Sequence, residues 1–179
     1  MSIRINNFTI KSGSIHRPSS IDSYTKVLLR FNGTSGSTTF TDEKGHVFTP
    51  YGNAKISMVQ SKFGGSSGEF DGNGDSIKTP YVANDFNLST ADFTLETWAY
   101  FRTVTQYRML VGRWSGVGVN YEQCYALRAG PSGRYSFVYT VNGVNNNAIE
   151  MAGTGSITPN VWQHWAVSRQ GRTLRLFVS

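Results

Sequence analysis

Acidic residues alternate with glycines in one short stretch of the chain, GEFDGNGDSIKTP at residues 68–80. Glu69, Asp71 and Asp75 fall within seven positions of this stretch. Carboxylates at such a density could hold a calcium ion, supply an acid and a base for catalysis, or hydrogen-bond the backbone of a turn. The three interpretations separate a metal-assisted binding protein from an enzyme and from a plain scaffold.

The first interpretation makes Asp71 and Asp75 candidate metal ligands. A helix-loop-helix calcium loop has oxygen ligands at positions 1, 3 and 5, glycine at position 6 and glutamate at position 12. Counting from Asp71, positions 3 and 5 fit, but positions 6 and 12 are Ser76 and Val82. We therefore expect no loop of this kind and no resident cofactor, and we keep calcium at Asp71 and Asp75 as an alternative.

The second interpretation pairs Glu69 with Asp71, because alternate residues of a strand share a face. Retaining glycoside hydrolysis needs two carboxyl groups about 5 Å apart, one of them with a raised pKa. Asp75 lies beyond a glycine that would bend the strand. We predict instead that Phe70 is a core residue and that residues 71–74 form a turn, with Asp and Asn side chains bonded to the backbone. We expect no catalysis at this site.

Sugar-binding surfaces combine aromatic faces, which stack on pyranose rings, with amides and charged groups that bind hydroxyls. Expected loops of this chain offer such side chains, and the candidates are Tyr107, Arg108, Arg113, Trp114, Tyr121 and Asn145. The two arginines would suit an acidic saccharide through paired donors. Packing of Trp114 beneath its loop is the alternative.

Two other groups of polar and aromatic residues are interpreted as structural. Glu96 alternates with Trp98 and Tyr100, which could form a sugar platform, but we interpret these positions as core. His164 alternates with Trp162 in WQHWA, and we expect a hydrogen-bonded core or rim histidine rather than a metal ligand.

Composition predicts one β-rich domain. The chain has 179 residues, 13% aromatic residues, 16% charged residues and 19 glycines, a balance typical of strands joined by tight turns. The single cysteine, Cys124, excludes an internal disulfide. The N-terminus has no apolar signal region and no run reaches membrane-spanning length. We expect no membrane insertion and synthesis without a standard secretion signal.

The positive charge is confined to the second half of the chain. Residues 1–96 contain nine Lys and Arg against nine Asp and Glu, whereas residues 97–179 contain eight Arg against two Glu, which gives +6. Such a half could attract an acidic polymer. Solvated strand faces are the plainer explanation. No nucleic-acid-reading motif accompanies the arginines, so we expect no nucleic-acid partner.

Short apolar or alternating runs separated by turn residues predict an antiparallel sandwich. Phe93 to Phe101 alternates over nine residues, with Phe93 and Leu95 on one side and Thr94 and Glu96 on the other. No helical periodicity persists. The expected strands are 27–31, 38–40, 46–49, 93–101, 125–128, 135–141, 162–169 and 173–178.

Residues 1–23 differ from the rest of the chain. Residues 4–10 could form a strand, and the Gly, Pro and Ser residues after it break the pattern. The segment is either a first strand with a linker or an arm that lies against another subunit. We favour an attachment arm at 1–23 and a single body at 24–179, because the segment is too apolar for a free tail.

Three ordered segments resemble one family. Residues 24–33 read YTKVLLRFNG, residues 61–101 contain FGG, EFDG and then DFTLETW, and residues 157–179 read ITPNVWQHWAVSRQGRTLRLFVS. In this order they resemble the concanavalin A-like, laminin G-type jelly roll. With a short N-terminal arm and no signal peptide, the combination looks most like bacteriophage virion proteins, notably tail-fibre and head-decoration components.

The resemblance implies an all-β antiparallel jelly roll and bears on both carboxylate hypotheses. Some laminin G-type domains bind calcium through acidic side chains, so Asp71 or Asp75 could join Asp42 or Asp92. Laminarinase-type hydrolases on this fold use an E-x-D-x-(x)-E strand, and here the last acid is replaced by Asn73 or Gly74. The resemblance thus implies a non-catalytic domain.

The family pattern continues beyond LRLFVS with further strands, so we expect the jelly roll to be incomplete at its C-terminal side. The alternative is that another chain or the N-terminal arm fills the gap. The function that the resemblance implies is a lectin-like virion protein that binds other virion proteins through its arm. Its body would bind an acidic or neutral host-surface polysaccharide, and we expect a homo-oligomer located in the virion. A purely structural decoration or fibre subunit is the alternative, and a polysaccharide-degrading enzyme is a third.

Overall fold

The computed structural model describes residues 3–12, 21–80, 86, 88, 90–114, 125–140, 148–153 and 155–179. The strands are β1 (Ile3–Ser12), β2 (Thr25–Leu29), β3 (Phe40–Thr41), β4 (Val47–Tyr51), β5 (Lys55–Ser57), β6 (Ser67–Phe70), β7 (Ser76–Lys78), β8 (Phe93–Phe101), β9 (Arg108–Arg113), β10 (Tyr125–Ala129), β11 (Tyr135–Thr140), β12 (Ala148–Ala152), β13 (Trp162–Gln170) and β14 (Thr173–Val178). Within these residues the only helix is the 3₁₀ turn η1 (Pro131–Gly133), so none is long and apolar enough to cross a membrane.

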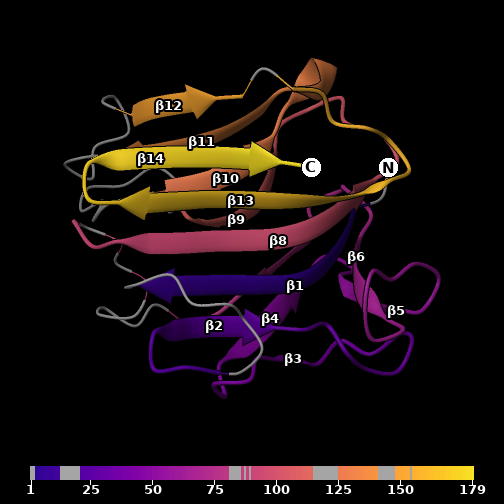
Figure 1. Cartoon of the computed structure of the whole chain (residues 1–179). Helices are drawn as coiled ribbons and strands as arrows, with labels where there is room; N and C mark the ends of the chain where they lie inside the picture. Colours follow the sequence, from indigo (N-terminus) through magenta and orange to yellow (C-terminus); the bar gives the residue numbers. More distant parts are fainter. Residues whose placement is uncertain are drawn as a thin grey trace.

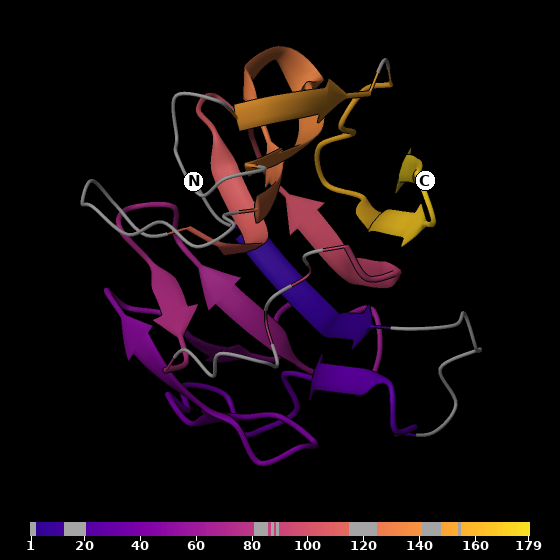
Figure 2. The ribbon, with the colours of Figure 1, turned by 90° about the vertical axis from the view of Figure 1, so that its left-hand side faces the viewer.

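The strands form a seven-stranded, a four-stranded and a three-stranded sheet, in which every pairing is antiparallel. The large sheet has the order β14-β13-β8-β1-β6-β5, and β2 also pairs with β1. It lies in front of β9–β12 in Figure 1, and the view along the strands in Figure 2 shows the two as separate layers. The predicted all-β antiparallel sandwich is confirmed.

Strand β1 lies inside the large sheet, between β8 on one side and β2 and β6 on the other. Its backbone pairs with β8 from Ile3 opposite Phe101 to Ser12 opposite Phe93, with an irregularity between Asn6 and Thr9. Residues 3–12 are therefore a first strand of the body, and the interpretation of this segment as an arm directed at another subunit is corrected. At the opposite side β14 is an edge strand, and the neighbour expected beyond it stays a prediction.

The core fills the space between the large sheet and the four-stranded sheet, whose order is β12-β11-β10-β9. Trp165 of β13 is fully buried there, with its ring centroid 5.7 Å from that of Phe101 and 5.8 Å from that of Tyr135 on the facing sheet. Truncation of a buried tryptophan to alanine costs about 3–5 kcal/mol. This aromatic contact therefore contributes strongly to holding the two layers together.

The alternation predicted for residues 93–101 is confirmed along the whole of β8. The odd-numbered residues are buried and the even-numbered residues are half-buried, because successive side chains of a strand point to opposite faces. The odd set enters the core and the even set lies on the outer face of the large sheet.

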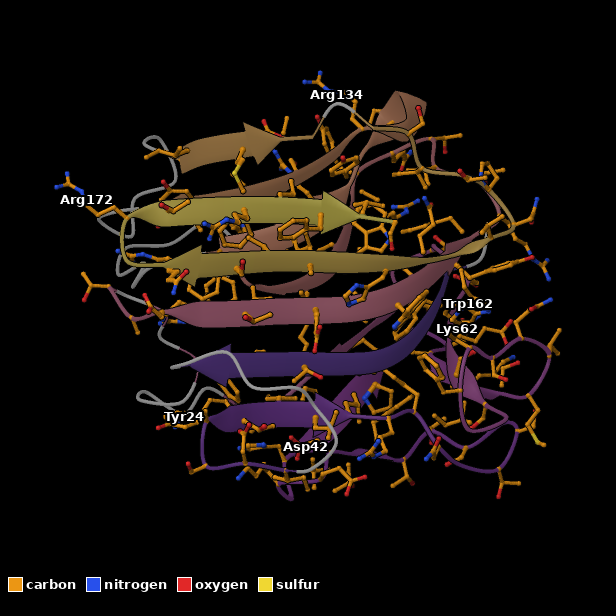
Figure 3. All side chains as sticks on the ribbon, viewed as in Figure 1. Tyr24, Asp42, Lys62, Arg134, Trp162 and Arg172 are labelled. Atoms are coloured by element: carbon orange, nitrogen blue, oxygen red, sulfur yellow. The ribbon has the colours of Figure 1, made fainter. Side chains whose placement is uncertain are left out.

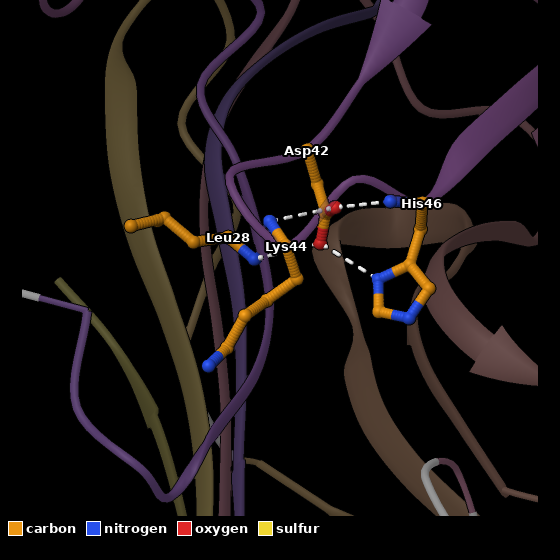
Figure 4. Close-up of polar contacts among 4 residues, drawn as sticks. All are labelled: Leu28, Asp42, Lys44 and His46. Carbon is orange, nitrogen blue, oxygen red and sulfur yellow. Dashed lines mark hydrogen bonds and ion pairs between the residues drawn. The ribbon is translucent and has the colours of Figure 1, made fainter.

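The turn between β3 and β4 is held by the Asp42 carboxylate, which is buried (Figure 4). It accepts backbone N–H bonds from Leu28 at 3.3 Å, Lys44 at 3.0 Å and His46 at 2.7 Å, and His46 Nδ1 lies 3.1 Å from Oδ2. β3 and β4, which lie at or next to the strands expected at 38–40 and 46–49, pair antiparallel as a hairpin. Through Leu28, Asp42 also ties this small hairpin to β2 of the large sheet.

Candidate functional site

The acidic stretch at residues 68–80 forms a turn between β6 and β7. Asp71 accepts bonds from the Asn53 side-chain amide at 2.8 Å and the Asn73 N–H at 2.7 Å. Asp75 accepts bonds from the N–H of Asp71 at 2.6 Å and of Asn53 at 2.8 Å. All four carboxylate oxygens thus accept hydrogen bonds within the turn and from its neighbour. The predicted turn is confirmed, and so is the burial of Phe70 in the core.

These bonds also define the electrostatics of the turn. The Asn53 side-chain amide, and after it the Asn73 backbone N–H, lower the pKa of Asp71, because they bind the ionised form. Gly52 has a φ of 69°, and a side chain at this position would collide with the Asp75 carboxylate. The glycine therefore allows the chain before Asn53 to approach the acidic turn closely.

Among the described residues, the structure does not gather the predicted calcium ligands Asp42, Asp71, Asp75 and Asp92 into one cluster. Asp42 holds the β3–β4 hairpin, and Asp92 accepts a bond from the Gly171 N–H at 2.7 Å. In the part of the chain that the structure describes, no three His, Cys, Asp or Glu side chains form a group that could hold a metal ion. Glu69 lies within β6, whereas Asp71 lies beyond its end. Calcium at Asp71 and Asp75 stays the untested alternative to a plain turn.

The four predicted sugar-binding residues that the structure describes do not meet in one place. Tyr107 and Arg108 lie at the start of β9, and Arg113 and Trp114 lie at its end. A strand rises about 3.3 Å per residue, so the two pairs are separated by roughly 16 Å. Tyr121 and Asn145, the other predicted contacts, lie outside the described residues. The strand that connects these candidates also keeps them apart.

Tyr107 belongs to a network on the four-stranded sheet. The Arg128 guanidinium carbon lies 4.5 Å from the Tyr107 ring centroid, and Arg128 Nη2 donates to Glu150 at 3.0 Å. Hydrogen bonding from Ser136, followed by that from Arg128, lowers the pKa of Glu150. Arg128 is therefore already engaged by an aromatic ring and a carboxylate, which makes this network a structural link between β10, β11 and β12.

A denser group of aromatic residues lies on the outer face of the large sheet. The register of β8 and β13 places Tyr100 opposite Trp162 and Trp98 opposite His164. All four side chains are half-buried. Glu96, Trp98 and Tyr100, which we interpreted as core positions, are therefore outer-face residues, and that interpretation is wrong. His164 is a hydrogen-bonded rim histidine, as predicted.

The rings on this face contact one another in two groups. In the first, the Tyr100 and Trp162 ring centroids are 5.7 Å apart, and Tyr100 Oη lies 3.4 Å from Asn160 Oδ1. In the second, the Trp98 centroid lies 5.2 Å from His164 and 5.7 Å from Phe63. We call the five residues Phe63, Trp98, Tyr100, Trp162 and His164 the aromatic face.

Charged groups border the second ring group. Lys62 Nζ lies 4.2 Å from the Trp98 ring centroid, within the range of a cation–π interaction. Glu96 Oε2 lies 3.2 Å from His164 Nε2, and an ionised carboxylate requires that this nitrogen carry the proton. Figure 3 shows Lys62 and Trp162 at the same end of the large sheet. The face therefore presents aromatic surface, a cation, a carboxylate and an amide together.

This combination can bind a ligand that has both apolar and polar surfaces. Aromatic rings bury C–H surface, and nearby amides and charged groups orient hydroxyls. The alternation within β8 and β13 indicated from the sequence which residues share one face of the sheet. The alternation did not indicate which of the two faces packs against the core. Lys62 and Phe63 come from the β5–β6 loop, and no sequence pattern placed that loop beside β8.

The fold is a β-sandwich whose large sheet presents the aromatic face on its outer side. Residues 71–179, which are more than half of the chain, match the family model described as the concanavalin A-like lectin/glucanases superfamily, in its laminin G-type form. The chain belongs to this superfamily, as its segments led us to expect. No curated protein and no solved structure matches the chain significantly.

Proposed function

We propose that this chain is a non-catalytic carbohydrate-binding domain and that the aromatic face is its sugar-binding surface. The observation that carries the proposal is the half-buried Tyr100–Trp162 pair on the outer face of the large sheet, with Asn160 bonded to the Tyr100 hydroxyl. Membership of a superfamily of lectins and glucanases supports the same function. The engagement of Asp71 in a turn supports the absence of catalysis.

The geometry favours an extended saccharide over a single buried sugar. Trp98 and Tyr100 are two residues apart on β8, so the two ring groups are separated by about 6.7 Å along the strand. A glycan chain that stacks one unit on the Tyr100–Trp162 pair would therefore place its next unit beside the group around Trp98. Half-exposed rings also leave the ligand open to solvent on one side, which suits binding along a polymer.

Glycan arrays and affinity electrophoresis in polysaccharide gels test the proposal. We expect Trp162→Ala to weaken binding about fivefold to thirtyfold, because one stacked ring contributes about 1–2 kcal/mol. Tyr51→Ala is the matched control, since Tyr51 is an exposed ring with Lys78 Nζ 4.4 Å from its centroid on the three-stranded sheet. Absence of binding to all glycans, or equal loss in both variants, would overturn the proposal. Release of reducing ends from a bound polysaccharide would contradict the non-catalytic assignment.

The finer proposal is that the domain belongs to a bacteriophage virion protein, a tail-fibre or head-decoration component that binds host-surface glycan. Its support is the resemblance of the ordered sequence segments. Since β1 pairs within the sheet, anchoring to the particle would need a surface other than an N-terminal arm. Intact mass spectrometry of purified particles tests this proposal, and absence of the chain from the particles would contradict it.

A structural subunit without sugar binding is the second candidate. One observation favours it, namely that Phe177 on the edge strand β14 is 50% exposed, as expected of a surface that packs against a neighbour. Light scattering after size exclusion would detect the homo-oligomer. A stable oligomer that binds no glycan would favour this candidate over the carbohydrate-binding domain.

A further inference from the structure

We infer that the glycan bound by the aromatic face carries an anionic substituent and that Lys62 is the residue that recognises it. The inference rests on the proposed function and adds the ligand class. It assigns different tasks to the two ring groups. The Tyr100–Trp162 pair would bind the sugar ring, and the group around Trp98 would bind the anion.

Trp98 is better suited to hold Lys62 than to stack on a sugar. The Lys62 ammonium lies 4.2 Å from the Trp98 ring centroid. The Phe63 ring makes an edge-to-face contact with the same Trp98 ring, at an interplanar angle of 87°. These neighbours occupy surface that a stacked sugar would need. Tyr100 and Trp162 have no such cation over their rings among the described residues.

The Lys62 charge is available to a ligand. Lys62 is exposed, and no carboxylate of the described residues forms an ion pair with it. A cation–π contact at an exposed site contributes about 0.5–1 kcal/mol, which is less than the contribution of a charge-assisted hydrogen bond. The ring therefore positions the ammonium without saturating it.

The nearby carboxylates do not neutralise this charge. Glu96 contacts His164, with Oε2 3.2 Å from Nε2. Glu69 lies on β6, and its paired positions on the neighbouring strands are Arg4 and Lys55. Glu96 thus has its own contact with His164, and Lys55 of β5 lies opposite Glu69, so among the described residues no carboxylate is ion-paired with Lys62 when an anion approaches. Uronic-acid carboxylates and sulfate esters share the chemistry that such a cation recognises.

Matched pairs of acidic and neutral polymers test the inference. The probes are polygalacturonate and hyaluronan, each with its carboxyl-reduced form, and dextran sulfate with dextran. We expect the wild-type chain to bind at least one acidic member about tenfold more tightly than its neutral counterpart at low salt. The preference should fall as salt rises, because exposed charges are screened. The carboxylate and sulfate probes distinguish the two sources of the anion.

Lys62→Gln should remove the preference for the acidic member while binding of the neutral member persists. Lys62→Arg should keep the preference, and Lys44→Gln, an exposed lysine in the β3–β4 turn, should leave it unchanged. Trp162→Ala should weaken both members equally. Equal binding of acidic and neutral polymers by the wild type, or a preference that survives Lys62→Gln, would overturn this inference alone. If the chain bound none of these polymers and no other glycan, the proposed function would be overturned as well.

Discussion

His164 on β13 and Glu96 on β8 meet on the outer face of the large sheet, with Nε2 of His164 3.2 Å from Oε2 of Glu96. The same imidazole lies against the Trp98 ring, at a centroid distance of 5.2 Å. One histidine therefore connects a carboxylate to the ring that holds Lys62. This links the electrostatics of the face to its shape.

We expect His164→Ala to weaken ligand binding about threefold to tenfold, because Trp98 loses a neighbour that helps to position it. Unfolding free energy should fall by less than about 1 kcal/mol, since the side chain is 32% exposed. Isothermal titration and urea unfolding measure the two effects. Ser168→Ala, a half-buried position on the same strand and face, is the control. Unchanged affinity in His164→Ala would contradict this positioning role.

Asp42→Ala should be strongly destabilising. The substitution removes a buried carboxylate that accepts hydrogen bonds from three backbone N–H groups and contacts His46 Nδ1. Unsatisfied buried donors of this kind cost about 2–4 kcal/mol in total. The adjacent Glu43→Ala breaks only the exposed ion pair with Arg30 and should cost less than about 1 kcal/mol. Urea unfolding followed by tryptophan fluorescence measures the free energy of unfolding of both variants. Equal losses of this free energy in Asp42→Ala and Glu43→Ala would contradict the role of Asp42.

The lowered pKa of Glu150 predicts a small dependence of stability on pH. Ser136 and then Arg128 favour the ionised form in the folded state. This contribution is complete above the ordinary value of 4.5 and is lost as pH falls through the folded pKa. With the side chain 39% exposed, solvent screening limits it to a few tenths of a kcal/mol. Urea midpoints of Glu150→Gln should be lower than those of the wild type at neutral pH and should converge with them in strong acid. A constant difference across this range would contradict the prediction.

Calcium should not alter stability through the acidic turn. Each carboxylate oxygen of Asp71 and Asp75 already accepts a bond from Asn53, Asn73 or the turn backbone, so a cation would have to displace those donors. We expect the same unfolding temperature with millimolar calcium and with a chelator. A rise with calcium that Asp71→Asn abolishes would show instead that the turn is a metal site.

Several features of this protein follow from the sequence by itself. The two-residue period of β8 predicted which side chains share a face, because a strand's side chains alternate whatever surrounds it. The glycines between Asp71 and Asp75 predicted a turn, because glycine readily adopts positive φ values that other residues rarely adopt. In the structure Gly72 and Gly74 have φ values of 85° and 80°. The order of three segments predicted the superfamily.

Only the tertiary structure decided which face of β8 is covered. Periodicity divides a strand into two sets of residues, but the packing of the four-stranded sheet determines that Thr97 is buried and Trp98 is not. The same holds for β1, since its place between β8 and β6 depends on strand pairings distant in the chain. Lys62 and Trp98 meet for this reason too. They are far apart in sequence, and only the path of the β5–β6 loop over the sheet brings the cation to the ring.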